Sequence, residues 1–161
     1  MKSLIIYMSI HHNNTENVAK AITQVLEAEL IKAHKVDINK VDNYDLIGFG
    51  SGIYWGKHHQ ALLKLSEKLP DLKGKRSFIF STSGLSNWMN SIHHIRNRTM
   101  HFHNPLKKKL SKKGFDIINE FTCRGFDTVG PLKLIGGICK CRPNEKDLEN
   151  AKKFARKLKE V

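Results

Sequence analysis

The chain has few cysteines and no long hydrophobic run, and both shortages narrow what it can be. Its three cysteines, Cys123, Cys139 and Cys141, are an odd number without zinc-site spacing, so we expect reduced structural thiols. No apolar run approaches the roughly 20 residues that a membrane span needs. The apolar run after Lys2 is also too short for a signal-peptide core. These absences predict a cytoplasmic protein that does not enter the membrane.

The sequence also lacks the residue sets that hydrolases and nucleic-acid readers depend on. No nucleophile or pair of catalytic carboxylates is apparent, and no helix-turn-helix, zinc-finger or RNA-recognition motif is visible. Nine histidines include the pairs His11-His12 and His58-His59, but adjacent residues seldom converge on one metal ion. Hydrolysis, nucleic-acid binding and a metal site are therefore not expected.

Positive charge is what the sequence has in excess. The 161 residues include 28 Lys and Arg against 15 Asp and Glu, for a net charge of +13. Residues 81–161 hold 17 of the basic residues and only 7 of the acidic ones. Such a field favours acidic partners or polyanions, and a solvated basic face is the alternative. The length and the 40% apolar content suit one domain over residues 1–161 with a proper core.

Short apolar runs alternate with amphipathic segments along the chain. Strands are predicted over residues 2–8, 35–38, 45–51, 76–81 and 115–123, the last with a bulge at Asn119, and helices over 15–30, 59–69, 104–113 and about 143–158. Residues 86–103 have weak periodicity and are expected to form a loop. This alternation predicts an α/β fold, a doubly wound and mostly parallel five-stranded sheet with helices on both faces.

The most informative stretch lies between the first predicted strand and the first predicted helix. Residues 9–15 read Ser-Ile-His-His-Asn-Asn-Thr, and no acidic side chain comes before Glu16. A helix N-terminus offers unpaired N–H groups and a partial positive charge. The stretch therefore indicates a phosphate cradle, although an ordinary N-cap turn has a similar composition. Four side chains could add donors: Ser9, Asn13, Asn14 and Thr15.

Two further unusual loops follow the third and fourth predicted strands. Residues 52–57 place Tyr54 and Trp55 between glycines, and residues 82–87 offer hydroxyl and backbone donors beside Gly84. In sheets of this kind ligands bind beyond the carboxyl ends of the strands, where the strand order reverses. A phosphate seat at one end and flat aromatic surfaces at the other outline a nucleotide-like cofactor.

In their order, these motifs resemble those of the flavodoxin family over almost the whole chain. The first loop is similar to the flavodoxin phosphate signature in Tyr7, Ser9, Asn14-Thr15, Ala19 and Ile22, but it has one residue more than is common between the serine and the threonine. Residues 51–55 and 81–84 fall where the family places its flavin loops. Residues 123–128, 136–137 and 142–144 are similar to a subgroup from anaerobes and archaea.

The resemblance implies a strand order of 2-1-3-4-5 and noncovalently bound FMN that serves low-potential electron transfer. The extra residue in the first loop places His11 or His12 close to the phosphate. The residues implied in cofactor binding are Ser9, His11, His12, Asn13, Asn14, Thr15, Ser51, Gly52, Ile53, Tyr54, Trp55, Gly56, Thr82, Ser83, Gly84, Asn87 and Phe126.

Three functions remain open at this point. An electron carrier is favoured over an FMN-dependent NAD(P)H:quinone or flavin oxidoreductase, because the chain is short and has no second dinucleotide fingerprint. A flavin-free module whose basic second half grips nucleic acid or another polyanion is the third. Because common flavodoxins are acidic and this chain is basic, we expect an acidic redox partner, either ferredoxin-like or a reductase. The chain itself is expected to be a monomer or a dimer.

Overall fold

Parallel strands form the central sheet, and a short antiparallel strand pairs with one of them. The computed structural model describes residues 1–84, 101–128 and 134–160. The predicted order 2-1-3-4-5 is confirmed, because the parallel strands run β2-β1-β3-β5-β6. Their bounds are β1 (Ser3–Met8), β2 (Glu29–Lys32), β3 (Leu46–Tyr54), β5 (Arg76–Ser83) and β6 (Asp116–Arg124), with β4 (Lys57–His58) paired to β3.

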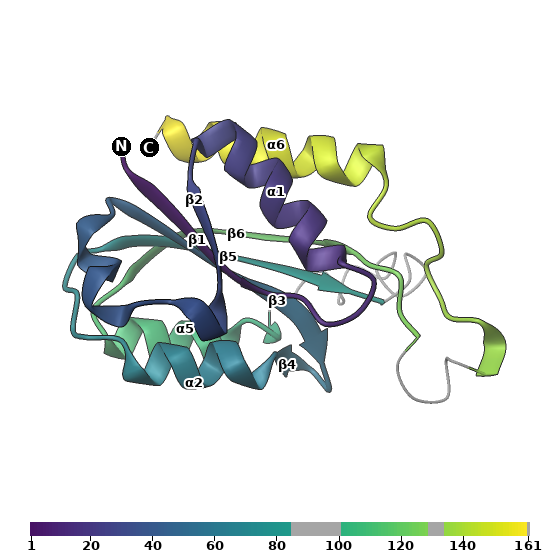
Figure 1. The fold of residues 1–161 in the computed structure, drawn as a ribbon, viewed down its shortest axis with the longest axis horizontal. Coiled ribbons are helices and arrows are strands. Elements are labelled where there is room, and N and C mark those ends of the chain that lie inside the picture. The colour runs from purple at the N-terminus through teal and green to yellow at the C-terminus, as the bar shows by residue number, and fades with distance from the viewer. Residues whose placement is uncertain (85–100, 129–133, 161) are drawn as a thin grey trace.

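Helices cover both faces of this sheet, as predicted (Figure 1). The helices α1 (Asn14–Leu26) and α6 (Glu145–Lys159) lie on one face, and α2 (Gln60–Lys68) and α5 (Asn104–Lys112) lie on the other. Side chains alternate across a strand, so β5 sends Phe78 and Phe80 into the α1/α6 core and Ile79 into the α2/α5 core. Two short 3₁₀ helices, η1 (Ala33–Lys35) and η2 (Ile38–Asn43), lead from β2 to β3. No helix in the described ranges is long and apolar enough to cross a membrane.

Two glycines of β3 leave room for aromatic side chains of the neighbouring strand β5, whose rings lie over these glycines. Gly48 pairs with Phe78 and Gly50 pairs with Phe80 in the parallel register. A Cβ atom added to Gly50 would come within 2.1 Å of the Phe80 ring. The α1/α6 core is therefore built on side chains that only glycine neighbours can accommodate.

The second strand lies earlier in the chain than predicted. The sequence pattern predicts a helix over residues 15–30 and a strand over 35–38, but α1 ends at Leu26 and β2 begins at Glu29. Glu27 takes a left-handed conformation (φ 51°) and its N–H bonds to the carbonyl of Thr23, which closes the helix. The apolar residues of β2 continue the helical spacing of α1. As an edge strand β2 is only partly buried, so its burial pattern does not stand out in the sequence.

The segment predicted as a loop over residues 52–57 is a β-hairpin. β3 continues to Tyr54, and the chain turns through Trp55 (φ 51°) and Gly56 (φ 77°) into β4. Positive φ at both central residues gives the turn that matches the twist of paired strands. The hairpin leaves the Trp55 side chain 89% exposed at its tip.

Other observed features lie close to the positions that the sequence predicts for them. The predicted bulge of the last strand lies one residue before Asn119, because Ser77 pairs with Ile117 while Phe78 pairs with Asn119. The last helix begins with a reciprocal capping box between Asn144 and Asp147. The loop expected over residues 86–103 falls mostly outside the described residues.

Replacing Gly50 by alanine should destabilise the fold, because the new methyl group would overlap the Phe80 ring. Overpacking of this kind costs about 1–3 kcal/mol. Urea unfolding of Gly50→Ala should therefore show a lower free energy of unfolding. The control is Gly74→Asn, since Gly74 has open space around it and asparagine tolerates its positive φ of 74°. Equal unfolding midpoints for the two variants would contradict the packing argument.

Candidate functional site

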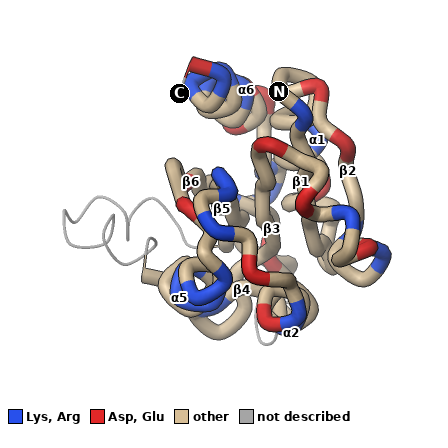
Figure 2. The backbone as a smooth tube through the Cα atoms, turned by 90° about the vertical axis from the view of Figure 1, so that its left-hand side faces the viewer, with Lys and Arg blue, Asp and Glu red and all other residues tan. Residues whose placement is uncertain are grey.

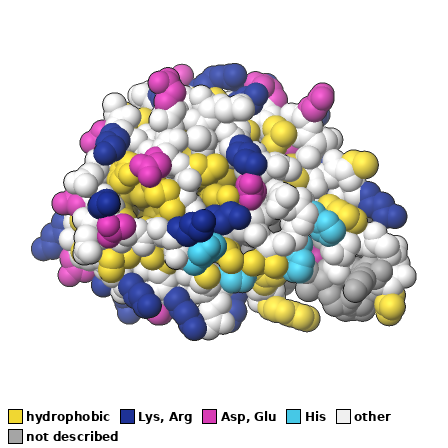
Figure 3. Space-filling model, in the orientation of Figure 1, with side chains coloured by type: hydrophobic (Ala, Val, Ile, Leu, Met, Phe, Trp, Pro, Cys, Tyr) yellow, Lys and Arg dark blue, Asp and Glu magenta, His cyan; other side chains and the backbone are white. Residues whose placement is uncertain are grey.

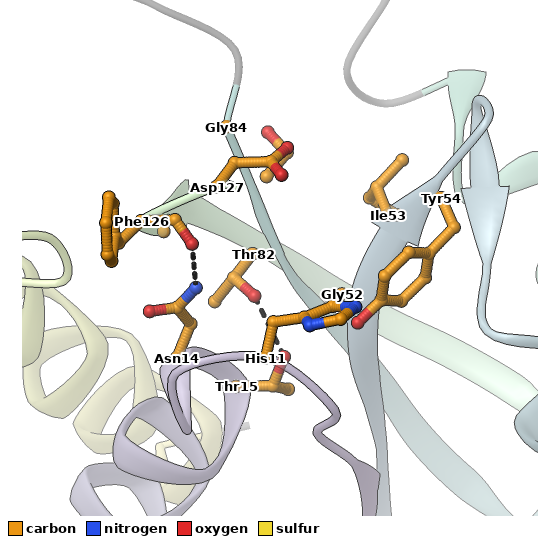
Figure 4. A pocket seen from close by; sticks show the side chains of 12 residues that line it. His11, Asn14, Thr15, Gly52, Ile53, Tyr54, Thr82, Gly84, Phe126 and Asp127 are labelled. Carbon is orange, nitrogen blue, oxygen red and sulfur yellow. Dashed lines mark hydrogen bonds between the residues drawn. The ribbon is translucent and has the colours of Figure 1, made fainter. Parts of the chain in front are cut away.

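A hollow opens where the carboxyl ends of β1, β3, β5 and β6 meet (Figure 4). These ends lie at one edge because the strands are parallel. Among its described lining residues, only His11 and Asp127 can carry a side-chain charge, and no lysine or arginine is present. The lining residues are His11, Asn14, Thr15, Gly52, Ile53, Tyr54, Thr82, Ser83, Gly84, Gly125, Phe126 and Asp127.

Two hydrogen bonds fix the start of α1 beside this hollow. The hydroxyls of Thr15 and Thr82 lie 2.8 Å apart in a buried contact that joins α1 to β5. The Asn14 amide donates to the carbonyl of Phe126 at 2.7 Å and joins α1 to the segment after β6. Gly125 fits beneath Asn14, since a Cβ atom there would lie 2.7 Å from the amide nitrogen. The N-terminus of α1 is thus held against two strand ends by side-chain bonds.

The loop before α1 keeps polar groups available for an anion. His12 and Asn13 both have positive φ, and the Asn13 N-cap makes no side-chain capping bond to the first helical turn. The hydroxyl of Ser9 is buried and has no hydrogen-bond partner among the described residues. Helical N–H groups without a side-chain cap, together with an orphaned hydroxyl, suit a phosphate group. This loop fits the phosphate of the cofactor that the sequence implied.

Tyr54 forms the wall of the hollow opposite α1. Its ring lies close over Gly52, where an added Cβ atom would be 2.9 Å from the phenolic oxygen. The ring of His11 lies 6.1 Å from the Tyr54 ring on one side, and the ring of His59 lies 5.5 Å away in an edge-on contact. Burial, reinforced by the negative charge of Asp127, raises the pKa of Tyr54 above its ordinary value. The side chain is therefore a neutral phenol at neutral pH.

The segment after β6 supplies a third wall. Phe126 donates its N–H to the Arg142 carbonyl, and Asp127 pairs with Ile138, so the excursion between β6 and α6 is tied at its base. His12 packs its ring 4.3 Å from that of Phe126 and bonds through Nε2 to the Thr128 hydroxyl at 2.9 Å. The loop before α1 and the segment after β6 are therefore in direct contact beside the hollow.

Most of the residues predicted to bind the cofactor meet at this hollow, and the others have distinct positions. His12 and Asn13 lie in the adjoining loop, and Ser9 lies at its start. Ser51 turns into the α2/α5 side of the sheet, where its hydroxyl bonds to His58. Trp55 and Gly56 form the hairpin turn outside the lining set. Asn87 lies outside the described residues.

Sequence reasoning missed two lining residues, Gly125 and Asp127. They flank the predicted Phe126 and follow the carboxyl end of the fifth parallel strand. The rule that placed ligands beyond strands one, three and four applies to that strand as well. Gly84 supports the position of Asp127, since a Cβ atom on Gly84 would lie 2.4 Å from the Asp127 Cβ. Gly84, which directly follows β5, was the sequence feature that could have indicated a close neighbour at this position.

Known proteins resemble this chain in sequence and in fold. An uncharacterized protein of Methanocaldococcus jannaschii is 46% identical over 158 residues, which cover 98% of each chain. Flavodoxin 2 from Bacillus cereus has a similar structure, with a TM-score of 0.69, 20% identity and coverage of 99% of both chains. A flavodoxin from the domain Archaea has a TM-score of 0.63 and 17% identity, and the match covers 99% of this chain and 97% of that one.

One further similar structure contains a cofactor. General stress protein 14 from Treponema denticola, in complex with FMN, has a TM-score of 0.64 and 14% identity, with 98% of this chain and 95% of that one covered. At these identities the structural likenesses establish the fold, which is flavodoxin-like. The family model described as a flavodoxin domain matches residues 4–123. This chain therefore belongs to the flavodoxin domain family, as the resemblance in its sequence had implied.

Proposed function

We propose that this protein binds FMN noncovalently in the hollow and carries electrons between redox partners. The observation that carries the proposal is the arrangement of the hollow itself. It has a helix N-terminus without a side-chain cap at one end and the half-buried phenol of Tyr54 at the other. The FMN complex of the similar Treponema denticola protein supports the choice of cofactor.

The phosphate would be held by the loop over residues 9–15. The hydroxyls of Thr15 and Thr82 bond to each other, which uses one of their two protons, so the remaining donors are one of these hydroxyls, the backbone N–H groups at the start of α1 and the Ser9 hydroxyl. The helix dipole offsets part of the phosphate charge. Since no lysine or arginine belongs to the described lining, the seat relies on these oriented groups.

The ring system would lie toward Tyr54, Ile53 and Phe126. FMN, when bound, supplies one-electron and two-electron transfer, and the protein sets the environment in which this happens. The apolar side chains exclude water, and Tyr54 stays a neutral phenol that can donate a hydrogen bond. The carboxylate of Asp127 lines the same hollow and repels added negative charge there. These groups favour a cofactor that accepts electrons only at low potential.

A second hollow gives the alternative function a physical basis. It shares His11 and Tyr54 with the first hollow and is also lined by Ile10, Trp55, Lys57, His58, His59 and Gln60. A nicotinamide or quinone in this space would make the protein an FMN-dependent NAD(P)H:quinone or flavin oxidoreductase. Steady-state NAD(P)H oxidation with a quinone distinguishes the two, because an electron carrier would show no sustained turnover.

The partner of such a carrier would be an acidic redox protein in the cytoplasm. α5 carries four lysines and no acidic residue, and on the other face of the sheet α6 carries further basic residues among its acidic ones (Figure 2). Around the hairpin, Ile10 and Trp55 are exposed apolar side chains. Figure 3 shows histidine side chains among apolar ones along the lower part of one face. Exposed apolar groups near positive charge suit an acidic docking surface.

A negative charge at the helix N-cap should weaken FMN binding by repelling its phosphate. Asn13→Asp keeps an N-cap residue that tolerates the left-handed conformation, so folding should be unaffected. We expect the Kd for FMN, measured by fluorescence quenching, to rise by about tenfold or more, which is about 1.4 kcal/mol or more. Riboflavin, which lacks the phosphate, should bind the variant and the parent equally.

The matched control for this variant is Asn17→Asp. Asn17 is exposed on α1 one turn further along, so it gains the same charge at a greater distance from the helix end. Its Kd for FMN should stay much closer to that of the parent. If neither parent nor variant quenches FMN fluorescence, the proposed function is wrong. If both variants weaken FMN and riboflavin alike, the phosphate is not at this loop.

Electron transfer to an acidic ferredoxin should depend strongly on salt. Raising the ionic strength from about 0.01 M to about 0.15 M shortens the Debye length from about 30 Å to about 8 Å and screens the attraction. Stopped-flow rates should therefore fall as salt is added, whereas rates with a small neutral reductant should change little. Equal rates with the ferredoxin at low and high salt would argue against an acidic partner.

A further inference from the structure

Two buried histidines lie beneath the hollow, on the α2/α5 side of the sheet. His58 is 1% exposed and His103 is fully buried, with their ring centroids 5.0 Å apart. They come from β4 and from the residue before α5. Each bonds to a buried serine, Ser51 or Ser81, that directly precedes a residue lining the hollow. The pair is thus coupled to the hollow through the ends of β3 and β5.

The bonds around Ser51 determine which nitrogen of His58 carries a proton. The Ser51 hydroxyl donates to the carbonyl of Gly52 at 2.8 Å and accepts from the N–H of His59 at 2.9 Å. A hydroxyl has one proton to give, so His58 Nδ1, at 2.9 Å, must donate to Ser51. Nε2 of the neutral ring is therefore a bare lone pair. It is buried and has no hydrogen-bond partner in the described part of the chain.

His103 lies in a different electrostatic environment. Its Nδ1 faces Glu120 at 2.8 Å, and Glu120 also pairs with Lys107. These contacts hold the pKa of Glu120 below its ordinary value even though burial opposes the shift. Nε2 of His103 faces the Ser81 hydroxyl at 2.8 Å, and that hydroxyl donates to Thr122 at 3.1 Å. With the Ser81 proton given to Thr122, Nε2 of His103 donates to Ser81.

The charged and titratable groups around the pair explain why His58 stays neutral before an electron is added in the hollow. Burial, together with the neighbouring His103, lowers the pKa of His58 well below its ordinary value. The one carboxylate in the network, Glu120, is already shared by Lys107 and His103. Among the described residues, a positive charge on His58 would have no counter-ion of its own. Negative charge in the hollow above would supply one.

We propose that Nε2 of His58 is a proton-binding site that fills when the cofactor in the hollow takes up an electron. The inference rests on the proposed function. One electron comes from an external low-potential donor and one proton comes from solvent, so no other bond is made or broken. His58 also belongs to the lining of the second hollow, together with Lys57 and Gln60, so the distance from its ring to solvent is short on that side. The added electron brings negative charge into the hollow that Asp127 lines. Uptake of the proton by His58 would offset that charge.

The first test is the pH dependence of the second one-electron potential of the FMN-loaded protein, from about pH 5 to about pH 8. Reduction raises the proton affinity of His58, so the potential should fall as pH rises between the low pKa of the oxidised state and the higher pKa of the reduced state. In His58→Asn this dependence should become shallower. Asparagine keeps an N–H donor for Ser51, so the variant should fold.

Two further variants separate a proton site from a packing role. His34→Gln changes an exposed histidine beside the edge strand β2, and it should keep the slope of the parent. His103→Gln removes the neighbour that repels a proton from His58, so the sloping region should move to higher pH. A histidine that only fills space would leave the slope unchanged in both His58→Asn and His103→Gln.

A second readout starts from the protein without cofactor. Imidazole ¹⁵N NMR of the apo protein should show His58 protonated on Nδ1 alone at neutral pH, and the reduced FMN-loaded protein should show both nitrogens protonated. The opposite tautomer in the apo protein would overturn the inference. Bound FMN with the same slope in His58→Asn and the parent would overturn it while leaving the proposed function intact. Failure to bind FMN at all would overturn both.

Discussion

The hydrogen bond between Thr15 and Thr82 is the contact on which the site depends. The two hydroxyls are 67 residues apart in sequence and meet in a buried position at 2.8 Å. Both groups would be left without water if separated, so the bond strongly favours one placement of α1 over the end of β5. Asn14 makes a similar connection to the segment after β6, because its side-chain amide donates a hydrogen bond to the Phe126 carbonyl. The positive end of the helix is thus directed at the hollow by side-chain bonds.

Because side chains alternate along β3 and β5, successive residues at the ends of these strands face opposite sides of the sheet. Gly52 and Thr82 line the hollow, while the preceding Ser51 and Ser81 turn to the α2/α5 side and bond to buried histidines. The hollow on one side of the sheet and the two buried histidines on the other are therefore reached from residues one position apart along each strand. On the mechanism we propose, this closeness would let charge in the hollow act on His58.

Long, strongly patterned segments could be predicted from the sequence, and weakly buried ones could not. The last helix followed from its cap at Asn144 and its apolar stripe, and the strand order followed from the family resemblance. β2 was misplaced because an edge strand buries too little surface to interrupt the helical pattern that precedes it. The hairpin after β3 was taken for a loop, because a turn through Trp55 carries only one of the glycines that usually mark it.

The sequence by itself determined that polar, phosphate-compatible loops follow apolar strands, because local composition decides where a strand ends and a helix begins. The tertiary structure alone decided which side chains share the hollow. Asp127 enters it and Trp55 points away from it, because strand register and turn geometry set side-chain direction. His58 and His103 meet for the same reason. Their pairing comes from the packing of α5 against β4 on one side of the sheet, which no local pattern in the chain records.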